Sequence, residues 1–269
     1  MKRAVISLLA TAFALSGLAA ETNQTALSSS LPQAAPASDT GIVALRRASE
    51  ANQYLFVFFY EKEDDATRAA RKTFDEAVKK IAPAPRSVVV DRAAAGEKEI
   101  VQQFGVDRAP MPLVLAIAPN GAVTGGFRAA DLTEQRLVDS VATPSMQQCL
   151  KALQERRLVF VCLQNGRTDA NEAAMKGVNE FKADARFAEA TTIVKLDPSD
   201  PKELKFLAQL KADPNAKLAS TAFLAPPGVI LAKVDGPTSK DNLVAALTKA
   251  MASCGSGCSP SGCGSAPQK

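Results

Sequence analysis

The chain has 269 residues, of which 46% are hydrophobic and 22% charged, so it can form one large or two small globular domains. Its formal net charge is only +4 and no block of like charge stands out, which excludes the basic surface used to bind nucleic acid. The absence of histidine removes the usual general base and the commonest metal ligand.

The N-terminus has the pattern of a secretory signal peptide. Lys2 and Arg3 precede an apolar run that extends to about Leu18, and small residues follow it. We therefore expect residues 1–20 to be removed on export and the mature protein to be periplasmic or secreted, where disulfides can form. Residues 21–39 are rich in Ser, Ala, Pro and Gln and predict a disordered leader. No other stretch predicts a membrane span, which needs ~20 apolar residues.

Residues 40–143 predict a first α/β domain. YLFVFFY (54–60) and SVVVD (87–91) are apolar runs of strand length. Two further strands flank Pro119-Asn120-Gly121, a strong hairpin signal because Asn and Gly tolerate positive φ. These strands are PLVLAIA (112–118) and AVTGGF (122–127). Apolar residues at three- and four-residue spacing predict helices over 41–52, from Asp64 to about Ile81, and over 98–106 and 132–142.

The same order of elements recurs in residues 145–252, with matched features about 103 to 107 residues apart. RLVFVCL (157–163) matches YLFVFFY, and TTIVKLD (191–197) matches SVVVD. A second hairpin spans 220–236. The remaining periodic segments predict helices over 145–154, about 169–185, 202–212 and 238–251. The sequence thus predicts two copies of one β-α-β-α-β-β-α unit, with the boundary near Pro144.

The segment FGVDRAPMPLVLAIAPNGAVTGGF (104–127) resembles the part of thioredoxin-like proteins in which a short helix leads to a cis-proline, a strand, a turn and an edge strand. The resemblance implies that the fold is α/β, with two tandem thioredoxin-like domains, each a mixed central sheet flanked by helices. It also implies that Pro112 is the cis-proline and that Met111 supplies the backbone facing the active site. In the second copy the resemblance rests on element order alone, because Ala219 or Ser220 stands where the proline is expected.

Both copies depart from the catalytic pattern of the family. Redox-active members carry Cys-x-x-Cys where the first strand turns into its helix, since the helix N-terminus lowers the thiol pKa. By alignment, Asp64 and Thr67 occupy these positions in the first copy, and the second copy has no cysteine there. A dithiol oxidoreductase site is therefore expected to be absent from both domains.

Three other groups of residues have alternative interpretations. The acidic loop EKEDD (61–65) could gather a hard cation, although we favour a single carboxylate that caps the following helix. Cys149 and Cys162 fall on apolar elements, where cysteine usually behaves as a small hydrophobic residue, and a disulfide between them depends on their separation.

Cys254, Cys258 and Cys263 lie in a Gly-, Ser- and Pro-rich segment, residues 253–269, which predicts a flexible tail. Their thiols could bind copper or zinc, or they could exchange disulfides with a partner. A third interpretation is a low-complexity tail without function. The odd number of cysteines also predicts an intermolecular disulfide as an alternative.

The sequence therefore favours an exported, non-catalytic protein that binds protein or peptide segments through Met111 and Pro112, as a chaperone or scaffold. It predicts no cofactor, unless copper or zinc binds to the tail, and no nucleic-acid partner. The alternative function is thiol–disulfide exchange or soft-metal handling through Cys254, Cys258 and Cys263. A purely structural role in an envelope assembly is a third hypothesis.

Overall fold

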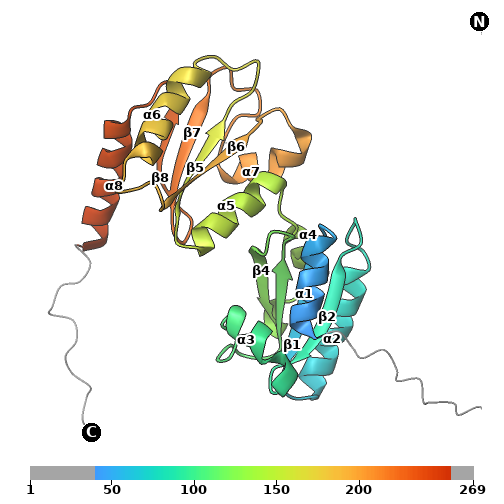
Figure 1. Ribbon diagram of the computed structural model, residues 1–269. Coiled ribbons are helices and arrows are strands. Elements are labelled where there is room, and N and C mark those ends of the chain that lie inside the picture. Colours follow the sequence, from blue (N-terminus) through green and yellow to red (C-terminus); the bar gives the residue numbers. More distant parts are fainter. Residues whose placement is uncertain (1–39, 256–269) are drawn as a thin grey trace, which may run out of the picture. The chain divides into compact units, whose positions relative to one another are not determined.

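The computed structural model describes residues 40–255, with side chains as far as residue 252, and contains two four-stranded sheets (Figure 1). The first sheet has the order β2-β1-β3-β4. β1 pairs in parallel with β2, whereas β3 pairs antiparallel with both β1 and β4. The strands are β1 (Leu55–Tyr60), β2 (Arg86–Asp91), β3 (Leu113–Ile117) and β4 (Val123–Arg128).

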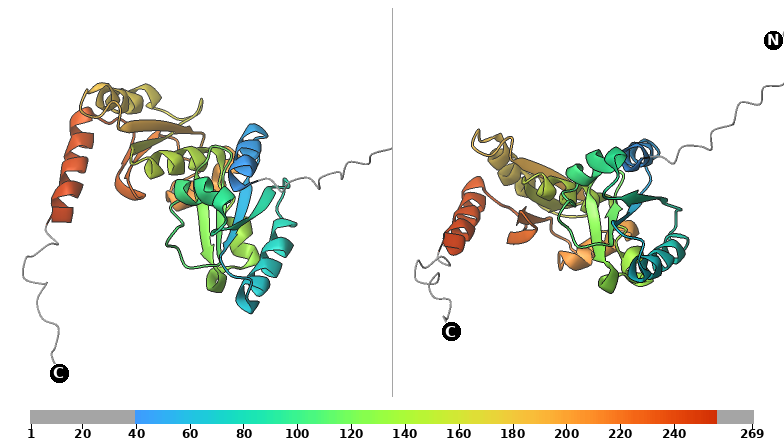
Figure 2. Two further views of the ribbon diagram at one scale, coloured as in Figure 1. Left: turned by 60° about the horizontal axis from the view of Figure 1, so that its bottom comes forward. Right: turned by 90° about the horizontal axis from the view of Figure 1, so that it is seen from below.

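Helices cover both faces of the first sheet (Figure 2). As a result, every residue of β1 from Leu55 to Phe59 is buried. Alternate residues of a strand point to opposite faces, so Val57 packs with α1 and α3, and Phe58 packs with α2 and α4. These helices are α1 (Gly41–Glu50), α2 (Asp65–Val78), α3 (Lys98–Gln103) and α4 (Glu134–Asp139). Short 3-10 helices, η1 (Ala95–Glu97) and η2 (Ala129–Asp131), precede α3 and α4.

The second sheet repeats this arrangement in the order β6-β5-β7-β8, again with one parallel and two antiparallel pairs. Its strands are β5 (Leu158–Leu163), β6 (Thr191–Leu196), β7 (Ser220–Ala225) and β8 (Val229–Asp235). Its helices are α5 (Pro144–Gln154), α6 (Asn171–Ala183), α7 (Leu204–Gln209) and α8 (Lys240–Gly255), and η3 (Pro201–Glu203) leads into α7. The predicted α/β architecture of two matching units is therefore confirmed.

Several helices are shorter than the apolar periodicity predicts, and two of the differences have a visible structural cause. The expected helix over 132–142 ends at Asp139, because the Ala142 N–H leaves the helix to donate to the Tyr54 hydroxyl at 2.8 Å. The long helix expected from about Asp169 begins two residues later. Asp169 instead forms a parallel bridge with Leu218, and α6 begins at Asn171.

Each unit has a glutamate that binds the N-terminus of its first helix. Glu97 at the end of η1 accepts the Gly41 N–H at 2.8 Å, and Glu203 at the end of η3 accepts the Ser145 N–H at 2.9 Å. The first N–H groups of a helix have no partner within the helix, so a carboxylate satisfies one of them and also opposes the positive end of the helix dipole. Glu203 is only 4% exposed.

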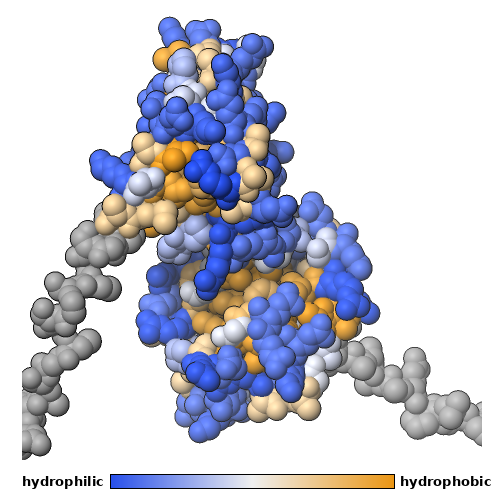
Figure 3. All heavy atoms as spheres, turned by 60° about the vertical axis from the view of Figure 1, so that its left-hand side comes forward, coloured by the Kyte–Doolittle hydropathy of each residue, from blue (hydrophilic) through white to orange (hydrophobic). Residues whose placement is uncertain are grey.

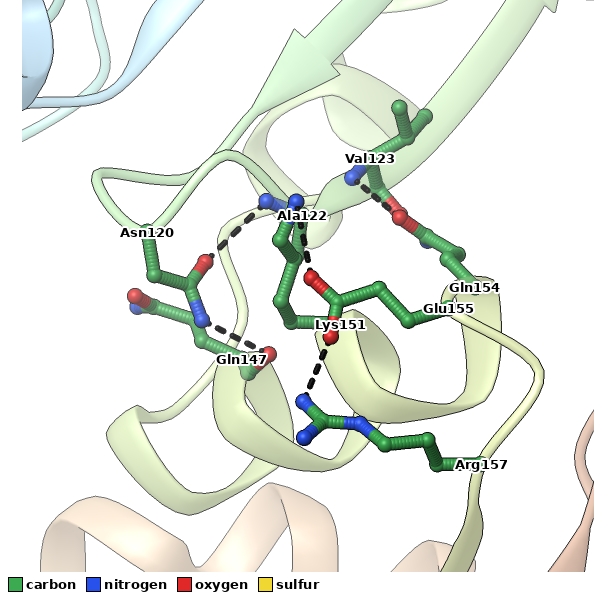
Figure 4. Close-up of polar contacts among 8 residues, drawn as sticks. All are labelled: Asn120, Ala122, Val123, Gln147, Lys151, Gln154, Glu155 and Arg157. Carbon is green, nitrogen blue, oxygen red and sulfur yellow. Dashed lines mark hydrogen bonds and ion pairs between the residues drawn. The ribbon is translucent and has the colours of Figure 1, made fainter. Parts of the chain in front are cut away.

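The turn between β3 and β4 is bonded to α5 (Figure 4). The Asn120 side-chain amide donates to the Gln147 carbonyl at 2.9 Å, and its oxygen accepts the Ala122 N–H at 3.1 Å. The Gln154 amide binds both the N–H and the C=O of Val123, at 3.0 and 2.7 Å. The predicted hairpin is thus confirmed, and Asn120 in its turn also contacts the next helix, α5.

Hydrophilic residues cover most of the surface in Figure 3, and apolar residues reach it in restricted patches. Within the described residues, no helix combines the length and the apolar character that crossing a membrane requires. The large hydrophobic side chains that are exposed are those of Val138, Leu204, Leu218, Val229, Ile230 and Met251.

Candidate functional site

Met111 and Pro112 lie directly before β3, at the end of the first sheet where β1 also ends. The Met111–Pro112 peptide bond is cis, as the resemblance implied. The Met111 side chain packs against the apolar cluster beneath α1 and α3. Among the residues that the structure describes, neither the N–H nor the C=O of Met111 has a hydrogen-bond partner. This backbone is therefore available to another chain.

Arg92, which the sequence reasoning missed, holds the segment that leads to Met111. Its guanidinium donates to the carbonyls of Asp107 and Ala109 at 3.1 and 2.8 Å, and also binds the Glu61 carboxylate. The Arg92 side chain is 17% exposed, so these bonds are partly shielded from water. The only sequence signal was its position one residue after a predicted strand.

The corresponding position in the second sheet is Ala219. Phe59 and Cys162 hold the same position in β1 and β5, and they pair with Leu113 and Thr221. Met111 lies two residues before Leu113, and Ala219 lies two residues before Thr221. The Ala219 N–H donates to the Asp169 carbonyl at 2.9 Å, and the Ala219 carbonyl accepts the Gly236 N–H at 2.6 Å. Asp169 also donates its N–H to Lys217 at 2.7 Å. The backbone that is free at Met111 is therefore occupied by the chain itself at Ala219.

The strand pairing and the cis-proline identify the fold. In each unit a parallel strand pair joined through a helix is followed by an antiparallel hairpin, and in the first unit a cis-proline precedes the hairpin. The chain contains two thioredoxin-like domains. No protein-family model and no curated protein sequence matches the chain.

Several solved structures are similar to parts of this chain. The first two thioredoxin domains of Saccharomyces cerevisiae Eps1p match 78% of this chain and 94% of their own, with 10% identity and a TM-score of 0.29. Human ERp44 matches 80% of this chain and 56% of its own, with 11% identity and a TM-score of 0.33. A disulphide isomerase from Xylella fastidiosa matches 36% of this chain and 81% of its own, with 19% identity and a TM-score of 0.28.

The first thioredoxin-like domain uses Asp64 and Thr67, the residues at the two expected cysteine positions, to begin α2. The Asp64 carboxylate accepts the Thr67 N–H at 2.8 Å, and this hydrogen bond lowers the pKa of the Asp64 carboxyl. Thr67 itself is buried. The capping interpretation of the acidic loop 61–65 is thus confirmed for Asp64.

Nearby, Arg68 binds Asp65 and the Glu63 carbonyl, so this loop is held by contacts within the chain. No group of three or more Cys, Asp or Glu side chains in the described part of the chain has an arrangement that could hold a metal ion.

The cysteines of the second thioredoxin-like domain behave as apolar residues. Cys149 and Cys162 are buried and free, and they belong to clusters on opposite faces of the second sheet. A disulfide between them would have to cross the sheet, so this alternative is wrong. Burial raises the pKa of both thiols to about 11, which keeps them protonated and unreactive near neutral pH.

The candidate tail site lies outside the described side chains. Cys258 and Cys263 fall in residues 256–269, and the side chain of Cys254, in the last turn of α8, is also outside them. Metal binding and thiol exchange by the tail therefore stay predictions. The signal peptide and leader, residues 1–39, are likewise outside the described part.

Proposed function

We propose that the protein is an exported, non-catalytic binder of extended peptide segments, and that its first thioredoxin-like domain makes the contact through the Met111 backbone. A bound segment would lie beside Met111 and Pro112 as an added strand. Main-chain hydrogen bonds would supply affinity with little dependence on the sequence of the segment, as in other cases of strand addition. This suits a chaperone or a scaffold better than a receptor for one ligand.

One observation supports this proposal above the others: the N–H and C=O of Met111 are both free among the described residues. Met111 is half-buried, and backbone donors and acceptors that are shielded from water are usually paired, so a peptide that pairs with them would be stabilised. The equivalent Ala219 in the second domain has both groups occupied. The comparison within one chain therefore favours the first domain as the binding domain.

The chemistry of the neighbouring residues supports binding without a covalent step. Asp64 carries a lowered pKa and is committed to capping α2, and Thr67 is buried. Arg92 and Glu61 form an ion pair that holds the segment before Met111. None of these side chains is a redox group, so the site offers shape, backbone and charge to a peptide.

The proposal can be tested with fluorescently labelled extended decapeptides and with the same peptides N-methylated at alternate residues. N-methylation removes the donors of one peptide edge and leaves the side chains unchanged. The methylated peptide loses the hydrogen bond that its N–H would donate to the Met111 carbonyl. At about 0.5–1.5 kcal/mol, this loss predicts binding roughly 2- to 13-fold weaker by fluorescence anisotropy. Equal affinity for methylated and unmethylated peptides would exclude strand pairing.

The position of the site can be tested by placing a photo-crosslinking residue at Met111 or at Val229. Val229 is the matched control because it is an exposed apolar residue of the second domain and would capture peptides that bind by nonspecific apolar contact. We expect peptide crosslinks at position 111 only. Equal crosslinking at both positions would contradict the assignment of the site to the first domain.

A further inference from the structure

The second domain has a cavity at the end of its sheet that corresponds to the Met111–Pro112 end of the first. The cavity measures about 380 Å³ and is lined by Leu163, the last residue of β5, and by Ser220, the first residue of β7. This volume is at the lower end of the ~300–1,000 Å³ of small-molecule sites. A strand cannot pair here, because Asp169 and Gly236 occupy the Ala219 backbone.

Ser220 is the unusual residue of this cavity. It is 5% exposed, and its hydroxyl has no hydrogen-bond partner among the residues that the structure describes. It lies on the same face of β7 as Ala222, toward α5 and α7, and pairs with Leu163 across the sheet. A buried hydroxyl without a partner is costly, and a ligand oxygen or N–H would remove that cost.

The charged residues around the cavity favour an anion. Lys211, Lys217 and Lys233 line it, together with two carboxylates, Asp213 and Asp235, so one positive charge is in excess. An excess of one positive charge suits a singly charged acid better than a phosphate ester, whose charge approaches −2 at neutral pH.

The ammonium group of Lys233 is held at the cavity wall by a contact with the main chain. Its Nζ donates to the Lys211 carbonyl at 2.8 Å, which joins β8 to the turn after α7 and leaves two donors for a ligand. Because this contact limits the motion of the side chain, less entropy is lost when an anion binds to it.

The remaining walls are apolar. Leu163, Ala212, Ala216 and Leu218 contribute to the lining, and the Leu218 side chain is exposed. A short hydrocarbon group would cover this surface while its carboxylate met the ammonium groups.

We propose that this cavity binds a carboxylate attached to a short apolar group, through Lys217, Lys233 and the Ser220 hydroxyl. The carboxylate could belong to a free small acid or to the C-terminus of a peptide, since both present the same chemistry. This function is separate from strand binding at Met111 and does not depend on it.

The test uses isothermal titration calorimetry on the purified protein at low salt, where exposed charges are least screened. The probe is 4-methylpentanoate, and 4-methylpentanamide is its uncharged control. We expect saturable binding of the acid that is at least tenfold tighter than binding of the amide. Lys233→Met should weaken binding of the acid about tenfold, which corresponds to ~1.4 kcal/mol. Ser220→Ala should weaken it severalfold without loss of stability, because the hydroxyl it removes has no partner.

Lys176→Met is the matched control, because Lys176 is an exposed lysine of α6 outside the cavity. Binding that is equal for the acid and the amide, or that falls equally in Lys176→Met and Lys233→Met, would overturn the proposal, as would the absence of saturable binding of the acid.

A leucine-terminated tripeptide with a free or an amidated C-terminus distinguishes the two sources. Binding of the free-acid tripeptide supports a peptide C-terminus, whereas binding of 4-methylpentanoate alone supports a small acid. Decapeptide capture at Met111 should be unchanged in Lys233→Met, so the two proposals can fail separately.

Discussion

Glu203 gives the sharpest test of how the second domain is held together. Replacing it by alanine should lower the free energy of unfolding by about 0.5–2 kcal/mol. Alanine leaves the Ser145 N–H without a partner at the start of α5.

The magnitude follows from the contacts of the two carboxylate oxygens. Oε1 accepts the Ser145 N–H at 2.9 Å, and a hydrogen bond to a charged group contributes about 1.5–3 kcal/mol. Ser145 is buried, so water does not replace the lost acceptor. Oε2 is buried and has no partner among the described residues, and its removal returns roughly 1 kcal/mol of the cost of burying it. The difference leaves about 0.5–2 kcal/mol.

Urea unfolding followed by circular dichroism measures this change, and the first domain supplies the matched variant. Glu97 makes the equivalent bond to Gly41 but is only half-buried, so water can replace part of it and Glu97→Ala should cost about 1 kcal/mol. Glu172→Ala removes an exposed acidic residue from the first turn of α6 and should stay within about 0.5 kcal/mol of the wild type. If Glu203→Ala were as stable as Glu172→Ala, the reasoning would be refuted.

Two further predictions concern the second domain. An added Cβ at Gly177 would lie 2.4 Å from the Thr238 carbonyl oxygen, so Gly177→Ala should cost about 1–3 kcal/mol in thermal denaturation despite its better helix propensity. Gly166→Ala, whose Cβ meets nothing within 4 Å, is its control, and greater stability of Gly177→Ala would refute the contact. Hydrogen bonds from Arg186 lower the pKa of Asp184, which also pairs with Lys240 at 3.4 Å. These contacts stabilise the charged form of Asp184 in the folded protein. The wild type should therefore be more stable than Asp184→Asn above about pH 4, and this difference should vanish as the pH falls through the folded pKa. A difference between wild type and variant that is the same at neutral and at strongly acidic pH would contradict this assignment.

Much of the fold follows from local patterns. The buried runs at 54–60 and 157–163 predicted the central strands because a strand covered on both faces is apolar at every position. Asn120 and Gly121 predicted the hairpin because both residue types tolerate positive φ, and Gly121 has a φ of 79° in the structure. The match to a thioredoxin-like segment also placed the cis bond before Pro112. Each of these signals lies within a few residues of the feature that it predicts.

The parts that sequence could not predict depend on contacts between distant residues. Glu203 lies 58 positions from Ser145, and no local pattern marks one glutamate among several as a helix cap. Asp169 looked like the start of a helix, but it forms an isolated parallel bridge with Leu218, outside the named strands. In this arrangement the Asp169 carbonyl accepts the Ala219 N–H, whereas the N–H of Met111 in the first domain has no partner among the described residues. This difference between the two domains has no local sign in the sequence.

The contact of Gln154 with β4 has a consequence for self-association. β4 is an edge strand, and an unpaired edge can add strands from other copies of the same chain. The Gln154 amide binds the outward N–H and C=O of Val123 as a neighbouring strand would, so α5 covers the start of this edge with a single side chain. A first domain separated from α5 would expose these two groups, so it should add strands from other copies more readily than the intact chain does.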